Sequence, residues 1–208
     1  MKKFVRKLLK RIWRINRKFR FTSKYKSQIK NKDFSIFSMN CLGGLLYHDL
    51  ELPFTSPFVN LYLDSEDFIK FCEEPKKYLA LEFEECNDYP DKDYPVGRLG
   101  DIEVNFVHYK TLEEAVEKWK SRALRINWDN IVVIATNRGG YNKELEERFN
   151  KLPYKKVLFT NVKDDNQNHY YISGYDDLPN VGLITAPTDR ISGRCVYDTF
   201  DWVKFFNL

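Results

Sequence analysis

Residues 131–160, IVVIATNRGGYNKELEERFNKLPYKKVLFT, decide the fold class of this 208-residue chain. Ile131 to Ala135 is a continuous apolar run, which is typical of a strand buried on both faces of a parallel sheet. The pattern predicts a helix from Asn142 to Asn150 and a second strand from Lys155 to Thr160. This β-α-β unit indicates an α/β domain with a mostly parallel sheet flanked by helices.

A second stretch, Phe34 to Asp49 (FSIFSMNCLGGLLYHD), places a candidate ligand site. It predicts a short apolar strand, a turn and then a helix. Two glycines after a strand let the backbone turn sharply and leave N–H groups uncovered, as an anionic or carbonyl-bearing ligand requires. We therefore expect Asn40, Gly43, Gly44 and His48 to contact substrate.

The charge of the chain is divided unevenly. Residues 1–32 hold fourteen Lys or Arg and no acid, whereas the whole chain has 34 Lys or Arg and 30 Asp or Glu. The sequence thus predicts a basic arm and linker, residues 1–33, followed by an acidic α/β domain, residues 34–208. The stretch from Thr22 to Lys32 is polar, basic and without periodicity, so an irregular linker is expected there.

Residues 1–20 predict a basic amphipathic helix. Apolar residues, Trp13 among them, recur at helical spacing and Lys or Arg fills the other face. This pattern is typical of a helix in a membrane interface, and we expect contact with the inner membrane surface. A helix packed on the body is the alternative. Nucleic acid is not expected as a partner, because the body is acidic and has no recognisable nucleic-acid motif.

The cysteines and the N-terminus indicate the compartment. The four cysteines are scattered, with neither a C-x-x-C pair nor zinc-like spacing. The N-terminal apolar residues are interrupted by Lys and Arg, unlike a secretory signal. No run approaches the roughly 18 apolar residues of a transmembrane helix. We expect a cytoplasmic protein, peripheral to the inner face of the membrane, with reduced thiols.

The loop Asn137-Arg138-Gly139-Gly140 follows a predicted strand and precedes a predicted helix. A phosphate there would meet free N–H groups, a helix dipole and a guanidinium together. A glycine-rich turn with a surface arginine is the alternative, because the loop matches no nucleotide-binding fingerprint. We expect Asn137, Arg138 and Gly139 to bind substrate.

A third group lies on one predicted strand, where alternation places Asp101, Glu103 and Asn105 on one face and His108 on the other. The polar face could bind sugar hydroxyls, hold a divalent cation or supply a general base. A solvent-facing strand edge is the alternative. His108, on the apolar face, is expected to be a core histidine rather than a base.

Cys41 is a candidate nucleophile, because a strand end beside a glycine turn is a setting that lowers a thiol pKa. Its base would have to be His48 or His108, although His48 lies two helical turns away, about 10 Å along the axis. A buried structural cysteine is the alternative.

Four quoted segments resemble a known family: SMNCLGGLLYHDL (38–50), LPFTSPFVNL (52–61), YPVGRLGDIEVNFVHYK (94–110) and KWKSRALRIN (118–127). They are similar to a bacterial family of uncharacterised proteins often labelled exopolysaccharide biosynthesis protein. The resemblance implies surface-polysaccharide or capsule assembly at the inner membrane face, without established catalytic residues. The family is associated with an acidic residue near residues 137–140; Gly139 in this chain favours an anion over a metal in that loop.

Three functions are compatible with these observations. The first is a transferase that modifies a lipid-linked or polymeric glycan from a phosphate-bearing donor, with Arg138 on the phosphates, Asp101 or Glu103 as base and Asn40 orienting the substrate. The second is a Cys41-dependent acyltransferase with Gly43 and Gly44 as oxyanion hole. The third is a membrane-docked module that binds glycan intermediates or an assembly partner without catalysis.

Overall fold

The computed structural model describes residues 2–208, with side chains from Phe4 onwards. The described chain forms two compact units. The first unit comprises the residues up to Lys32 together with Leu45–Pro53 and Leu183–Leu208. The second unit comprises Asp33–Gly44 and Phe54–Gly182.

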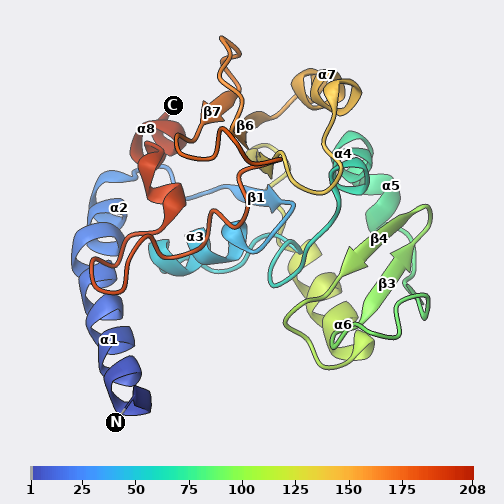
Figure 1. Ribbon diagram of the computed structural model, residues 1–208. Coiled ribbons are helices and arrows are strands. Elements are labelled where there is room, and N and C mark those ends of the chain that lie inside the picture. Colours follow the sequence, from blue (N-terminus) through green and yellow to red (C-terminus); the bar gives the residue numbers. More distant parts are fainter. Residues whose placement is uncertain (1) are drawn as a thin grey trace. The chain divides into compact units, whose positions relative to one another are not determined.

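The second unit contains the parallel sheet that the sequence predicts (Figure 1). Its strands are β1 (Ser35–Ser38), β5 (Ile131–Thr136), β6 (Lys155–Thr160) and β7 (His169–Tyr171), hydrogen-bonded in the order β1-β5-β6-β7. All three pairings are parallel. Every residue of β1 and β5 is buried, as expected for strands covered on both faces. The α/β prediction is confirmed.

Four helices of the second unit are described, and two of them begin at a side-chain cap. The four are α4 (Ser65–Glu73), α5 (Pro75–Leu79), α6 (Leu112–Ala123) and α7 (Lys143–Lys151). Thr111 Oγ1 accepts the Glu114 N–H at 3.2 Å and starts α6. Asn142 Oδ1 accepts the Leu145 N–H at 3.0 Å and starts α7. Each acceptor satisfies one of the free N–H groups of a first helical turn.

A second sheet was not predicted. It is antiparallel, with β2 (Glu84–Glu85), β3 (Val96–Leu99) and β4 (Ile102–Asn105). Residues 58–63 alternate in hydrophobicity like a strand, but no strand forms there; Tyr62 makes an isolated bridge to Asn105. Asn60 has a φ of +64°, a left-handed conformation that interrupts extended backbone.

The core of the second unit is built largely from aromatic rings. Phe58 lies 5.2 Å from Phe37 of β1, 4.8 Å from Phe71 of α4 and 5.6 Å from Trp119 of α6, measured between ring centroids. These spacings fall in the range of favourable tilted and edge-to-face pairs. The apolar stripes of both helices are therefore anchored on the sheet through one ring cluster.

The first unit is mostly helical. It contains α1 (Lys2–Arg17), a π-helical stretch (Lys18–Thr22), α2 (Ser23–Gln28), a 3-10 helix (Val196–Thr199) and α8 (Trp202–Asn207). Helix α3 (Leu42–Leu50) begins in the second unit and ends in the first. The predicted N-terminal helix is confirmed. The linker prediction was wrong for Ser23–Gln28, because Tyr25 is buried and turns that segment into a packed helix.

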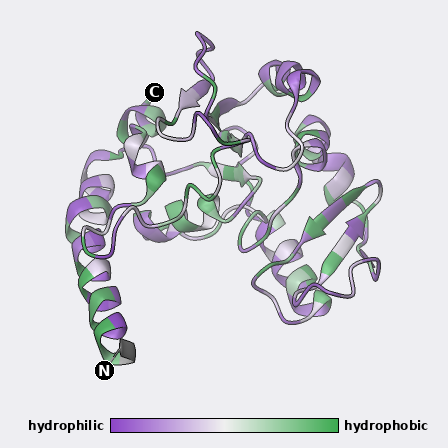
Figure 2. Ribbon diagram, viewed as in Figure 1, coloured by the Kyte–Doolittle hydropathy of each residue, from purple (hydrophilic) through white to green (hydrophobic). Residues whose placement is uncertain are grey.

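Helix α1 carries hydrophilic and hydrophobic residues on different sides (Figure 2). Its last turn lies beside the loop before the 3-10 helix, where Asn16 Nδ2 donates to the carbonyl of Ile191 at 2.7 Å. Among residues 2–208, no helix is both long enough and apolar enough to cross a bilayer.

Candidate functional site

Three asparagines follow three neighbouring strands of the parallel sheet. Asn40 comes two residues after β1, Asn137 directly after β5 and Asn161 directly after β6. Because the carboxyl ends of parallel strands share one edge, these side chains gather where ligands of open α/β sheets bind. Asn137 Nδ2 donates to Asn161 Oδ1 at 2.6 Å, so two of them are in direct contact. Asn40 Oδ1 accepts the Leu42 N–H at 3.0 Å, at the start of α3.

Asn137 and Asn161 also hold the chain segment that crosses this edge. Asn137 Oδ1 accepts the Val181 N–H at 3.0 Å. Asn161 Nδ2 donates to the carbonyls of Tyr175 and Leu178. Their amides thus position residues 175–181 beside the end of β5, and their remaining hydrogen-bonding capacity for a ligand is small.

The loop after β5 is fixed by the first residue of α4. The Ser65 hydroxyl donates to the carbonyl of Arg138, and the Ser65 N–H donates to the carbonyl of Gly139 at 2.9 Å. The loop backbone is therefore held by its carbonyls. The half-buried Arg138 side chain takes part in none of the ion pairs formed among residues 4–208. A guanidinium without a carboxylate partner is available to an anionic ligand.

Tyr62 and Asp64 lie against this loop. The Tyr62 hydroxyl donates to Asp64 Oδ1 at 2.5 Å. Gly139 has a φ of +69°, and a Cβ there would meet the Tyr62 hydroxyl and stand 2.7 Å from Asp64 Oδ1. The position therefore requires glycine by both conformation and space. Burial, then the bond to Asp64, raises the pKa of Tyr62, although the charge of Arg138 opposes the shift.

Asn105 is bonded to Tyr62, which lies against the loop after β5. The two residues exchange backbone hydrogen bonds of 2.8 and 2.9 Å. Lys92 Nζ donates to Asn105 Oδ1 at 2.7 Å and lies 3.6 Å from the centroid of the Tyr89 ring. The structure thus joins Asn105 to the Tyr62–Asp64–Gly139 cluster and places a second cation, Lys92, beside it.

Asp101 and Asn105 do not lie on the same strand, although the sequence predicted that they would. Asp101 lies in the turn between β3 and β4, not on the strand as expected. Tyr78 donates to its Oδ1 at 2.8 Å and Lys70 Nζ lies 3.3 Å from its Oδ2. The hydrogen bond from Tyr78, then the one from Lys70, lowers the pKa of Asp101. A lowered pKa makes a carboxylate a weaker general base near neutral pH.

Glu103 is on β4 and is held by one residue before β3 and by one residue of β3. Tyr89 donates to its Oε2 at 2.7 Å and Arg98 donates to its Oε1 at 3.0 Å. The hydrogen bond from Tyr89 is the main cause that lowers the pKa of Glu103. Both of these carboxylates thus belong to structural networks.

The expected turn after β1 forms at residues 39–41, but placing Gly43 and Gly44 in it was wrong, because they lie beyond it in α3 and serve packing. Both are buried within α3. A Cβ at Gly43 would stand 2.9 Å from the Cβ of Ser38, and a Cβ at Gly44 would stand 3.2 Å from a methyl carbon of Val59. The absence of side chains lets α3 approach β1 closely, so these glycines do not expose their backbone to a ligand as expected.

Cys41 does not have the low pKa that the sequence suggested. Burial raises the pKa of its thiol, and its Sγ donates to the carbonyl of Leu61 at 3.8 Å. No hydrogen bond joins Cys41 to either proposed base among the described residues: His48 is exposed on α3, and His108 is exposed in a turn after β4. The core position expected for His108 was wrong because the strand ends at Asn105.

We therefore expect Cys41 to behave as an unactivated thiol. Because its folded pKa is raised, its thiolate fraction should be below that of a free cysteine at neutral pH and should grow only at alkaline pH. The check is the rate of iodoacetamide alkylation of the native protein against pH, with Cys41→Ala reporting the background from the three buried cysteines. A rate already at its maximum below about pH 7 would contradict this expectation.

Comparison with known proteins assigns the chain to a family. Residues 12–207 match the model of a family described as a domain of unknown function, DUF1919. The chain belongs to the DUF1919 family. This DUF1919 protein is 39% identical over 184 residues to a protein of Haemophilus influenzae described as an uncharacterized protein, covering 86% of this chain and 87% of the relative.

Among residues 4–208 of this DUF1919 protein, two groups of side chains could hold a metal ion. One is Cys86, Asp88 and Glu103, and the other is Glu146, Asp164 and His169; in each, the ligand atoms lie within 4.8 Å of one another. In the first group the guanidinium of Arg98 contacts all three residues and already supplies the positive charge. In the second group His169 Nδ1 lies 2.7 Å from Asp164, an ordinary ion-pair distance. Neither group includes Asp64, whose carboxylate lies beside Gly139.

The sequence did not indicate four residues of the candidate site: Tyr62, Asp64, Asn161 and Lys92. Asn161 had a readable signal, because it directly follows the predicted strand that ends at Thr160. Asp64 had none, because its approach to Gly139 depends on hydrogen bonds between segments more than 70 residues apart.

Proposed function

We propose that this DUF1919 protein is a transferase of bacterial surface-polysaccharide biosynthesis. It moves a group from a phosphate-bearing donor, such as a nucleotide sugar, to a lipid-linked or polymeric glycan. One observation carries the proposal: Arg138 has no ion-pair partner among the described residues, and it lies in the loop between β5 of the parallel sheet and α7. The polysaccharide setting is supported by the resemblance of residues 38–61 and 94–127 to proteins with that label.

Donor binding is assigned to the loop between β5 and α7. A phosphate at this edge would meet the guanidinium of Arg138 and the positive end of α7, a helix of nine residues. The carbonyls of Arg138 and Gly139 are engaged by Ser65, so they do not repel the phosphate from the same positions. Lys92 supplies further positive charge beside Asn105.

The acceptor base is assigned to Asp64. Its side chain is exposed, its orientation is fixed by the Tyr62 hydroxyl, and it lies against Gly139 of the donor loop. It would take the proton of an acceptor hydroxyl while that oxygen forms the new bond and the donor phosphate leaves with the electron pair. Asp101 and Glu103, the bases that the sequence favoured, are the comparators because both are held in other networks.

The donor assignment is tested by thermal shift of the full chain with nucleotide sugars and with acyl-coenzyme A, each with and without Mg²⁺ or Mn²⁺. We expect a nucleotide sugar to stabilise the wild type and Arg138→Ala to lose that shift. Arg125→Ala, at an exposed arginine of the second unit, is the control and should keep it. A shift with acyl-coenzyme A that disappears in Cys41→Ala would instead support the acyltransferase.

The base assignment is tested with the donor that binds. Asp64→Asn should reduce transfer by about 10²- to 10⁴-fold while donor binding is retained, and Asp101→Asn should stay near wild type. The reverse order would return the role to Asp101. Saturable glycan binding without product from any donor would favour the non-enzymatic binding module.

A further inference from the structure

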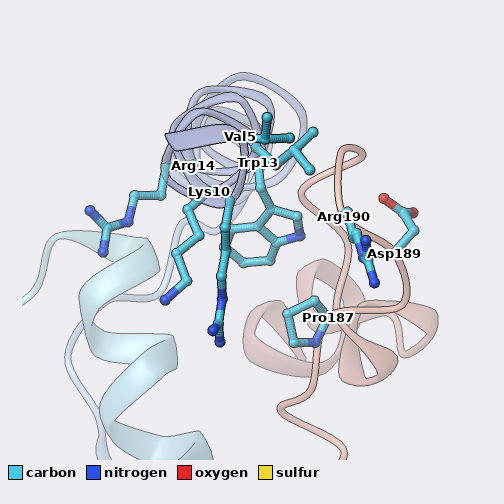
Figure 3. Close-up of a pocket in the computed structure, with 9 residues that line it drawn as sticks. Val5, Lys10, Trp13, Arg14, Pro187, Asp189 and Arg190 are labelled. Carbon is cyan, nitrogen blue, oxygen red and sulfur yellow. The ribbon is translucent and has the colours of Figure 1, made fainter. Parts of the chain in front are cut away.

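Helix α1 and residues 187–190 enclose a groove of about 930 Å³ within the first unit. Figure 3 shows Trp13 projecting from α1 toward the segment that carries Pro187 and Arg190. The apolar part of the lining comes from Val5, Leu9, Trp13 and Pro187. The buried Nε1–H of Trp13 has no acceptor among the described residues, so a bound oxygen atom would complete its hydrogen bonding.

The polar part of the groove is strongly basic. Arg6, Lys10 and Arg14 line it and follow one another at intervals of four residues, on one face of α1. Arg190 lines it from the other side, opposite Lys10 and Arg14 (Figure 3). The one acid of the lining, Asp189, is engaged by the backbone N–H groups of Ile191 and Ser192 at 2.7 and 2.6 Å. The groove therefore combines an apolar floor with an excess of positive charge, which suits an amphiphile with an anionic head.

A second row of α1 side chains is apolar and faces water. Phe4 is 74% exposed, Leu8 47%, Ile15 47% and Phe19, just beyond the helix, 72%. Intervals of four and seven residues place them on one side of the helix. This row lies on nearly the opposite side of α1 from Arg6, Lys10 and Arg14. A helix with one apolar face and one basic face is the pattern of a helix that lies in a membrane interface.

We propose that α1 and its groove dock the first unit on a leaflet of anionic phospholipid. The apolar row enters the boundary between headgroups and acyl chains, and Arg6, Lys10, Arg14 and Arg190 bind lipid phosphates. Exposed apolar side chains favour lipid over nucleic acid, whose phosphates would leave them in water. This docking does not depend on the reaction at the parallel sheet.

The test is co-sedimentation of the full chain with vesicles of phosphatidylcholine alone and with phosphatidylcholine mixed with phosphatidylglycerol. We expect binding to the mixed vesicles, weakened by salt and not displaced by inorganic phosphate. Replacing Arg6, Lys10 and Arg14 together by Gln should lower the partition coefficient roughly 100-fold, since each cation near an anionic leaflet contributes a factor of about five. Leu8→Ser with Phe19→Ser should lower it at least about tenfold.

Two further variants separate the groove from the helix alone. Arg190→Gln removes a groove cation that is not on α1 and should lower binding about fivefold. Leu124→Ser changes a 90% exposed leucine of the second unit and should leave binding unchanged. Unchanged vesicle binding by Arg190→Gln would overturn the claim that the groove binds lipid phosphates. Equal binding to both vesicle types, or tighter binding to duplex DNA than to the mixed vesicles, would overturn the docking proposal.

Discussion

Arg17→Ala is expected to cost about 3–5 kcal/mol of unfolding free energy, the range found when one partner of a buried ion pair is removed. Arg17 is the last residue of α1 and is only 7% exposed. It pairs with Asp49 of α3 and with Asp198 of the 3-10 helix. The Asp198 side chain is fully buried and that of Asp49 is 9% exposed, so alanine would leave two carboxylates without their cation.

The rest of the network shows why neighbouring groups do not replace the guanidinium. Arg17 also donates to the Tyr197 hydroxyl at 2.6 Å and to the carbonyl of Gly193 at 3.1 Å. Tyr197 in turn donates to Asp49 at 3.0 Å, and Tyr25 donates to Asp198 at 2.9 Å. Burial by itself would lower the pKa of Arg17, but Tyr197 and the two carboxylates outweigh it and raise the pKa, so the side chain stays charged.

The measurement for Arg17 is chemical denaturation of the full chain. Arg14→Ala is the matched control, because it removes an exposed arginine from the same helix and should change the unfolding free energy by no more than about 0.5 kcal/mol. If Arg17→Ala lowered the unfolding free energy by less than about 1 kcal/mol, the network would contribute no more than a surface ion pair does. That result would contradict its structural role.

Gly193→Ala is expected to lower the free energy of unfolding by about 2–5 kcal/mol, for two reasons. Gly193 has a φ of +79°, which costs an L-residue about 1–2 kcal/mol. A Cβ there would also stand 2.6 Å from the Cα of Arg17 and 2.8 Å from the carbonyl carbon of Asn16. Both are backbone atoms of α1, so the helix has to shift, and overpacking of this kind costs a further ~1–3 kcal/mol.

Gly174→Ala separates these two sources. Gly174 has a φ of +85° with no atom within 4 Å of its Cβ position, so only the backbone cost applies. We expect both variants to be less stable than wild type in denaturant titrations, with Gly193→Ala lower than Gly174→Ala by at least about 1 kcal/mol. Equal losses would show that α1 does not pack on Gly193 as closely as described.

The fold was predictable where its signals are local in the chain. The apolar run from Ile131 forms a strand and Asn142 starts a helix, both as expected, because each signal acts over a few residues. Strand alternation was misleading at residues 58–63, because the positive φ of Asn60 is set by packing and not by the hydrophobic pattern.

The site was less predictable because its contacts join distant segments. Asn137, Arg138 and Gly139 were found from their position after a strand, but the proximity of Asp64 arises through Ser65. The role of Gly43 depends on the distance to Ser38, which no sequence pattern contains. Arg17 looks like any of the fourteen basic residues in the first 32, and only the fold distinguishes it.

The most direct test of the proposed donor site is the dissociation constant of a nucleoside diphosphate sugar, measured by calorimetric titration of the full-length wild type, Arg138→Ala and Arg125→Ala. A charged hydrogen bond contributes about 1.5–3 kcal/mol, so Arg138→Ala should bind roughly 10- to 100-fold more weakly, while Arg125→Ala should match the wild type. Equal affinity in all three proteins would contradict a donor phosphate at the carboxyl edge of the parallel sheet.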